Sequence, residues 1–144
     1  MIRCLLDVNV LIALLDAGHA FHQRAHQWWA ASSRAWASCP LTENGLVRIM
    51  SSTAYSKEDN FSVDDITARL SYFAEHTDHA FWIDDLTVRN TSRFQLSHLI
   101  SSRHLTNVYL LALAVKNEGQ LVTFDQHVPN HSVVGAEPRH LRVI

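Results

Sequence analysis

Glycine, proline and cysteine are all scarce in this chain, which has four, three and two of them among 144 residues. So few glycines and prolines argue against a loop-rich scaffold and favour long regular elements. Two cysteines are too few for a disulfide framework. Cys4 and Cys39 both fall in predicted buried strands, so we expect them to be small core residues in a reducing cytosol.

Long apolar runs are also missing. No stretch approaches the ~18 apolar residues of a membrane-spanning helix, so no membrane association is expected. The first residues lack a basic region followed by an apolar one, and we therefore expect no signal peptide and a cytoplasmic protein. The net charge of −2 gives no general attraction to nucleic acids, although ten of the twelve basic residues are arginine and could form a local phosphate-binding patch.

Zinc-binding motifs are absent despite ten histidines. There is no HExxH sequence and no Cys/His pair at zinc spacing. His19, His22 and His26 have near-helical spacing, but a lone helical cluster of this kind is a weak signal. We expect these histidines to be surface or partly buried residues.

Short apolar stretches alternate with helical patterns along the chain. Its composition, 47% hydrophobic and 18% charged, predicts one globular domain over residues 1–144. Such alternation predicts an α/β fold, with a mainly parallel sheet of four to five strands and helices on both faces. The strands are expected at residues 2–6, 34–39, 80–83, 120–124 and 141–144. The helices are expected at 10–15, 21–33, 42–50, 62–76, 91–101 and 107–118. Thr42 can cap the third of these helices, and a left-handed Gly119 is expected to end the last.

Three acidic residues, Asp7, Glu43 and Asp125, each follow a predicted buried strand. Each alone could be a helix cap, a partner of a helix dipole or a turn residue. Together they would lie at one edge of a parallel sheet, where they repel each other unless a cation neutralises them. Oxygen ligands in an incomplete shell favour Mg²⁺ or Mn²⁺, and such sites hydrolyse phosphodiesters through water activated by one or two ions.

Three stretches, LLDVNVLIAL (5–14), LTENGLVRIM (41–50) and LTNVYLLALAVKNEGQLVTFD (105–125), resemble the PIN-domain ribonucleases, and in particular the VapC-type toxins. This resemblance covers the whole chain in order, spacing and length. It implies a three-layer α/β/α fold and a metal-dependent endoribonuclease, the toxin of a type II toxin–antitoxin pair. It also implies Mg²⁺ or Mn²⁺, an RNA substrate, a VapB-like antitoxin and a homodimer.

The resemblance assigns roles by position. Asp7 and Glu43 match the first two family acids, and Thr123 and Asp125 match the closing TxD motif. The implied catalytic and metal-binding set is therefore Asp7, Glu43, Asn107 and Asp125. The implied substrate-binding residues are Asn9, Arg48 and Thr123, and Arg103 and His104 could flank the same groove.

Asn107 departs from the family pattern, which has aspartate at this position. An amide keeps an oxygen ligand but removes one negative charge, which should weaken the binding of a hard cation. Three explanations remain open: a natural, slow or repurposed enzyme, a natural enzyme compensated by a nearby acid, or an engineered change. Asn107 is also an ordinary residue near a helix start.

Other classes of protein also place acids at strand ends. A catalytically weakened PIN domain could bind RNA or protein without cleaving. A receiver-like signalling domain would use Asp84 or Asp85 as phosphoacceptor, but it expects an acidic pair by the first strand and a lysine after the last. Haloacid-type phosphatases need DxD where this chain has Asp7-Val8-Asn9. A solvated strand end is the simpler role for Asp84 and Asp85.

Overall fold

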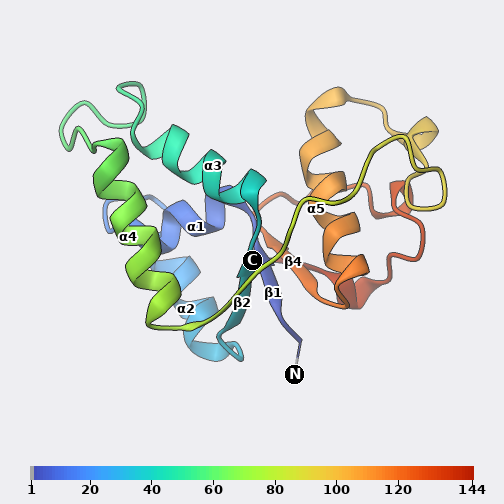
Figure 1. The fold of residues 1–144 in the computed structure, drawn as a ribbon, viewed down its shortest axis with the longest axis horizontal. Coiled ribbons are helices and arrows are strands. Elements are labelled where there is room, and N and C mark those ends of the chain that lie inside the picture. Colours follow the sequence, from blue (N-terminus) through green and yellow to red (C-terminus); the bar gives the residue numbers. More distant parts are fainter. Residues whose placement is uncertain (1) are drawn as a thin grey trace.

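The computed structural model describes residues 2–144 and contains one five-stranded parallel sheet in the order β3-β2-β1-β4-β5. The chain alternates between strands and helices, so helices lie on both sides of the sheet (Figure 1). The strands are β1 (Cys4–Leu6), β2 (Ala35–Ser38), β3 (Asp78–Phe81), β4 (Gln120–Thr123) and β5 (Leu141–Val143). The helices are α1 (Val8–Leu15), α2 (His22–Ala31), α3 (Pro40–Met50), α4 (Val63–Glu75) and α5 (Leu105–Lys116).

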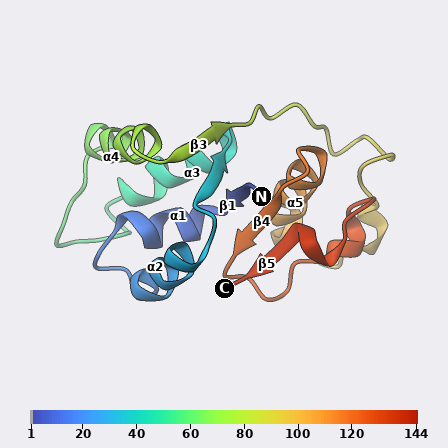
Figure 2. The same ribbon diagram turned by 90° about the horizontal axis from the view of Figure 1, so that it is seen from below.

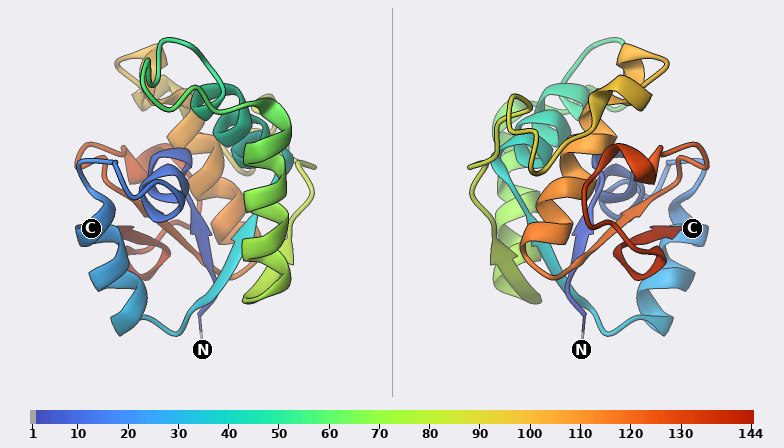
Figure 3. Two further views of the ribbon diagram at one scale, coloured as in Figure 1. Left: turned by 90° about the vertical axis from the view of Figure 1, so that its left-hand side faces the viewer. Right: turned by 90° about the vertical axis from the view of Figure 1, so that its right-hand side faces the viewer.

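The sheet separates two hydrophobic cores. Helices α1 to α4 lie on one side and α5 on the other (Figure 2), which is the expected three-layer α/β/α arrangement. Neighbouring residues of a strand point to opposite faces, and accordingly Leu6 belongs to the core under α1 to α4 while Leu5 belongs to the core under α5. Figure 3 shows the same division, with α1, α2 and α4 in front of the sheet and α5 behind it in the left view.

Two central strands bring the ends of distant segments together. β1 and β4 are neighbours, and Leu6 is paired with Val122. Asp7 follows directly, and its backbone N–H donates to the Val122 carbonyl at 3.0 Å. Because parallel strands end at the same edge, Asp7 and the residues after Val122 share one side of the sheet.

Several local expectations differ from the structure. α3 begins at Pro40, and Thr42 is its third residue, whose hydroxyl accepts the Cys39 N–H at 3.0 Å. Thr42 therefore does not cap the helix as expected, because proline at the first position starts the helix two residues earlier. The expected helix at 91–101 is wrong, since this stretch contains turns and a 3₁₀ segment, Leu96–His98. Phe94, Leu96 and Leu99 anchor the segment to the α5 core, whereas Ile100 is exposed, so these residues do not form one helical stripe.

The turn after α5 also differs from expectation. The left-handed residue is Glu118, with φ of 55°, and Gly119 does not have a positive φ. Gly119 is instead placed where a side chain has no room. A Cβ atom there would lie 2.6 Å from Trp82 Cη2 and 2.7 Å from the Arg3 carbonyl oxygen.

We expect Gly119→Ala to destabilise the protein by about 1–3 kcal/mol, because overpacking forces the neighbours to move. The Arg3 carbonyl also accepts the Gln120 N–H at 3.0 Å, so the shift would disturb the pairing of β1 and β4. Thermal unfolding measures the effect. Gly18→Ala is the control, since its Cβ would meet nothing closer than 3.4 Å, and an equal loss in both variants would contradict the steric explanation.

The histidines near the N-terminus have a structural role. His22 Nδ1 lies 2.7 Å from the Ala13 carbonyl and His26 Nε2 lies 2.9 Å from the Leu14 carbonyl. These carbonyls belong to the last turn of α1, where backbone acceptors lack helical partners. The two rings pack together with centroids 4.3 Å apart, so this pair joins α2 to the end of α1.

Over residues 2–144, each helix lacks the length or the apolar character needed to cross a membrane.

Candidate active site

Asp7 lies at the junction of β1 and α1, where it caps the helix. Its Oδ1 accepts the Val8 N–H at 2.7 Å and its Oδ2 accepts the Thr123 hydroxyl at 2.8 Å. The side chain is almost fully buried, with 7% of the residue exposed. Burial raises the pKa of Asp7, the two hydrogen bonds oppose that rise, and the negative charge of Asp125 adds to it.

Asp125 continues this network from the end of β4. Its N–H donates to the Thr123 hydroxyl at 3.0 Å, and its Oδ2 accepts the Asn107 Nδ2–H at 3.0 Å. His104 Nδ1 lies 4.0 Å from the same Oδ2 atom. The structure thus brings Asp7, Thr123, Asp125 and Asn107 together, as the resemblance to PIN-domain ribonucleases implied.

Glu43 lies elsewhere along the same edge, in the first turn of α3. Its Oε2 accepts the Ser38 hydroxyl at 2.5 Å, and within residues 2–144 it makes no hydrogen bond to the other three positions of the implied metal set. Across that part of the chain, no three His, Cys, Asp or Glu side chains form a group that could hold a metal ion. Position 107 contributes an amide in place of a carboxylate, which leaves two acids close together.

The remaining substrate-binding candidates lie at the surface. Asn9 is exposed in the first turn of α1, and Arg48 is exposed in the last turn of α3. Neither side chain makes a hydrogen bond or ion pair within residues 2–144, so both are free to contact a ligand. Thr123 differs from them, because it is fully buried and bonded to Asp7.

Asp84 is exposed, as the sequence suggested, but it also makes structural contacts that the sequence did not indicate. Its Oδ2 accepts the Leu41 N–H of the first turn of α3 at 2.9 Å, and its Oδ1 accepts the Tyr109 hydroxyl of α5 at 3.0 Å. Burial and the Asp84 carboxylate raise the pKa of Tyr109. Asp85 pairs with Lys116. Both acids are occupied by structural contacts, which disfavours a phosphoacceptor role.

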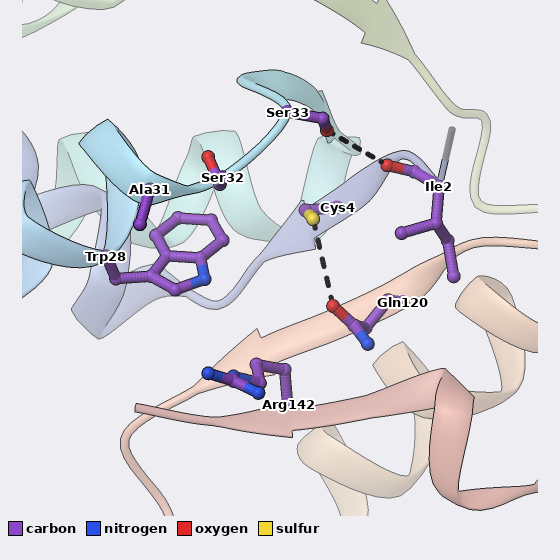
Figure 4. Close-up of a pocket in the computed structure, with 8 residues that line it drawn as sticks. All are labelled: Ile2, Cys4, Trp28, Ala31, Ser32, Ser33, Gln120 and Arg142. Atoms are coloured by element: carbon purple, nitrogen blue, oxygen red, sulfur yellow. Dashed lines mark hydrogen bonds between the residues drawn. The ribbon is translucent and has the colours of Figure 1, made fainter.

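A cavity at the opposite edge of the sheet is unrelated to these acids. It has a volume of about 250 Å³ and lies beside Cys4 and Gln120, which begin β1 and β4 (Figure 4). Cys4 Sγ lies 3.9 Å from Gln120 Oε1, and burial raises the pKa of this thiol. Both cysteines are free and buried, as expected.

The residues at the carboxyl edge fit a hard divalent cation chemically. Asp7 and Asp125 offer carboxylate oxygens, and Asn107 offers an amide oxygen once its side chain turns by about 180°, as amide torsions allow. Burial is the main cause of the raised pKa of Asp7, and a cation would relieve the smaller contribution, the repulsion by Asp125. The Asn107 amide already offsets part of the negative charge at the site, because its N–H group donates to the Asp125 carboxylate.

Comparisons with known proteins agree with this geometry. The PIN domain family model matches residues 4–133. Ribonuclease VapC44 of Mycobacterium tuberculosis is 41% identical over 145 residues, which cover 99% of each chain. Ribonuclease VapC39 of the same species is 36% identical over 132 residues, 91% of this chain and 94% of that protein. The crystal structure of M. tuberculosis VapC20, a toxin that cleaves the Sarcin-Ricin loop, has the same fold with a TM-score of 0.62 and 13% identity, covering 94% of this chain and all of that one. The chain therefore belongs to the PIN-domain family, among the VapC ribonucleases.

Proposed function

We propose that this protein is a metal-dependent endoribonuclease and the toxin of a type II toxin–antitoxin pair. The observation that carries the proposal is the bonded group of Asp7, Thr123, Asp125 and Asn107 at the carboxyl edge of two central strands. The proteins that are similar to this chain over nearly its full length are named ribonucleases. The RNA substrate is proposed on this basis, and the structure contributes the acidic edge where a phosphodiester would lie.

Asp7, Asp125 and the amide oxygen of Asn107 would hold Mg²⁺ or Mn²⁺, with Glu43 joining from α3. When bound, such an ion supplies charge neutralisation at the scissile phosphate and a more acidic water. The protein's own groups prepare the site. Thr123 orients Asp7 by its hydrogen bond, and the exposed side chains of Asn9 and Arg48 would contact RNA phosphates.

A second candidate function is an RNA- or protein-binding PIN domain with little activity. It is favoured by the hydrogen bond from Asn107 to Asp125, since this bond partly satisfies the carboxylate without a metal. A VapB-like antitoxin is the proposed protein partner in either case, because the chain falls among the VapC proteins. A homodimer is proposed on the family resemblance alone.

We expect the purified chain to cleave structured RNA in the presence of Mn²⁺ or Mg²⁺ and to stop when EDTA is added. The same ions should raise the melting temperature, because a ligand that binds only the folded state stabilises it. Glu43→Gln should reduce both the RNA cleavage and the rise in melting temperature. Glu75→Gln, an exposed acid at the end of α4, is the charge-matched control and should change neither.

The outcomes separate the candidates. Stabilisation by Mn²⁺ without RNA cleavage would replace the nuclease with the binding domain. If neither ion affects stability or cleavage, the proposed metal site is wrong.

A further inference from the structure

Ser38, the last residue of β2, joins two titratable side chains from different elements. Its Oγ lies 2.5 Å from Glu43 Oε2 in α3 and 2.7 Å from His79 Nε2 in β3. Ser38 is completely buried. The sequence pattern gave no sign of this cluster, because its members come from three separate elements.

The hydroxyl has one proton, and this fixes the direction of both hydrogen bonds. An ionised carboxylate only accepts, so Ser38 donates its proton to Glu43. The serine oxygen then accepts from His79, which must carry a hydrogen on Nε2. Burial lowers the pKa of His79 and so favours the neutral ring. The result is a directed chain from His79 through Ser38 to Glu43.

The histidine end of this chain is held in place by packing. The His79 ring packs on Trp36 with centroids 4.4 Å apart, and Trp36 is fully buried with its Nε1–H donated to Thr77 Oγ1 at 2.7 Å. Trp36 and His79 are also paired residues of adjacent strands. A glutamate side chain ordinarily keeps much rotational freedom, worth up to ~2 kcal/mol when it is lost. Here the hydrogen bond from the buried Ser38 restrains the Glu43 side chain.

The cluster is not a hydrolase triad, although it contains serine, histidine and an acid. In such a triad the histidine lies between the other two and takes the serine proton. Here Ser38 lies between Glu43 and His79, and its proton goes to Glu43. Ser38 is also completely buried, so a substrate cannot reach its hydroxyl. A nucleophilic role is therefore excluded by both order and burial.

We propose that Ser38 and His79 are positioning residues that hold the Glu43 carboxylate in the orientation the metal site needs. This inference rests on the proposed function, in which Glu43 is a ligand. Partners that orient a metal ligand typically change metal affinity or activity by 10–100-fold when they are removed. The hydrogen bonds of Ser38 match that role, because they act on Glu43 and on no other member of the implied metal set.

A double-mutant cycle on Mn²⁺ affinity tests this. Calorimetric titration of Ser38→Ala should show about tenfold weaker Mn²⁺ binding than the unaltered protein. In a Glu43→Gln background the same substitution should change affinity less than about twofold, because its partner is already neutral. An equal factor in both backgrounds, or no change in either, would overturn the proposal.

A matched pair at His79 separates positioning from packing. His79→Gln keeps an N–H donor near the Nε2 position and should retain affinity, whereas His79→Phe keeps a ring on Trp36 but has no donor and should lose about tenfold. Loss in both variants, or in neither, would contradict the assigned role. If the unaltered protein binds no Mn²⁺ and cleaves no RNA, the proposed function itself fails and this inference fails with it.

Discussion

Asn107→Asp is expected to raise Mn²⁺-dependent RNA cleavage by about 10–100-fold, the range typical of changes beside a bound metal. The substitution adds a carboxylate at the start of α5, next to Asp125. More negative charge in the ligand set strengthens the binding of a hard cation. In growing cells the same variant should be more toxic.

The stability of the variant should depend on metal in a characteristic way. Asn107 Nδ2 now donates to Asp125 Oδ2 at 3.0 Å, and aspartate at position 107 cannot donate while ionised. The two carboxylates would repel each other and the negative charge of Asp7. We therefore expect a lower melting temperature without metal and a larger increase on adding Mn²⁺ than in the unaltered protein.

Asn117→Asp is the matched control. It makes the same chemical change at the other end of α5, where the Asn117 amide donates to the Leu113 carbonyl at 2.8 Å. This variant should lose some stability with no gain in cleavage and no larger response to Mn²⁺. Unchanged metal affinity and activity in Asn107→Asp would remove position 107 from the site.

Asp7→Asn is expected to abolish detectable cleavage and, at the same time, to raise thermal stability near neutral pH. The Asp7 carboxylate is nearly buried and is repelled by Asp125, so its ionised form lowers the stability of the folded state. Asparagine can still cap α1 and bond to Thr123. A gain of ~1 kcal/mol would appear as a rise of about 2–4 °C.

The pH dependence follows from the direction of the shift. Burial raises the pKa of Asp7 above its value in the unfolded chain, so the folded state binds this proton more tightly. The folded state is therefore favoured at acidic pH, and this contribution is lost as pH rises from the unfolded pKa of about 4 through the folded pKa. Asp7→Asn should remove this loss, and its stability advantage should shrink as pH falls.

Denaturant unfolding between pH 4 and 8, with RNA cleavage on the same samples, measures both effects. Asp16→Asn is the control because Asp16 is also buried and accepts hydrogen bonds from the Gly18 N–H and the Tyr55 hydroxyl. It lies at the end of α1, away from the site, and should leave cleavage unchanged. Cleavage that survives in Asp7→Asn would refute the role given to Asp7.

The sheet and the main acidic residues could be predicted because their signals are local. Each buried strand is a short apolar run, and Asp7 and Asp125 follow such runs directly. Parallel pairing then brings their ends together without further information. The two-sided core likewise follows from helices that alternate with strands.

The parts that sequence reasoning missed depend on long-range contacts. Asp84 contacts the start of α3 and the middle of α5, and the bonds of Ser38 connect three elements. None of these partners is marked by spacing along the chain. The predicted helix at 91–101 is wrong because Phe94, Leu96 and Leu99 anchor an irregular segment to the core, which periodicity does not distinguish from a helical face.

The strand order of the sheet also determines when, during synthesis of the chain, the acidic site can form. Asp7 and Glu43 come from elements that precede β3, whereas Asn107 and Asp125 belong to α5 and the end of β4. During synthesis β1 and β2 can pair while β4, the other neighbour of β1, is still missing. A chain cut short before β4 would have an unpaired edge on β1 and would lack Asp125. The arrangement thus delays the assembly of a harmful activity until nearly the whole fold has been made.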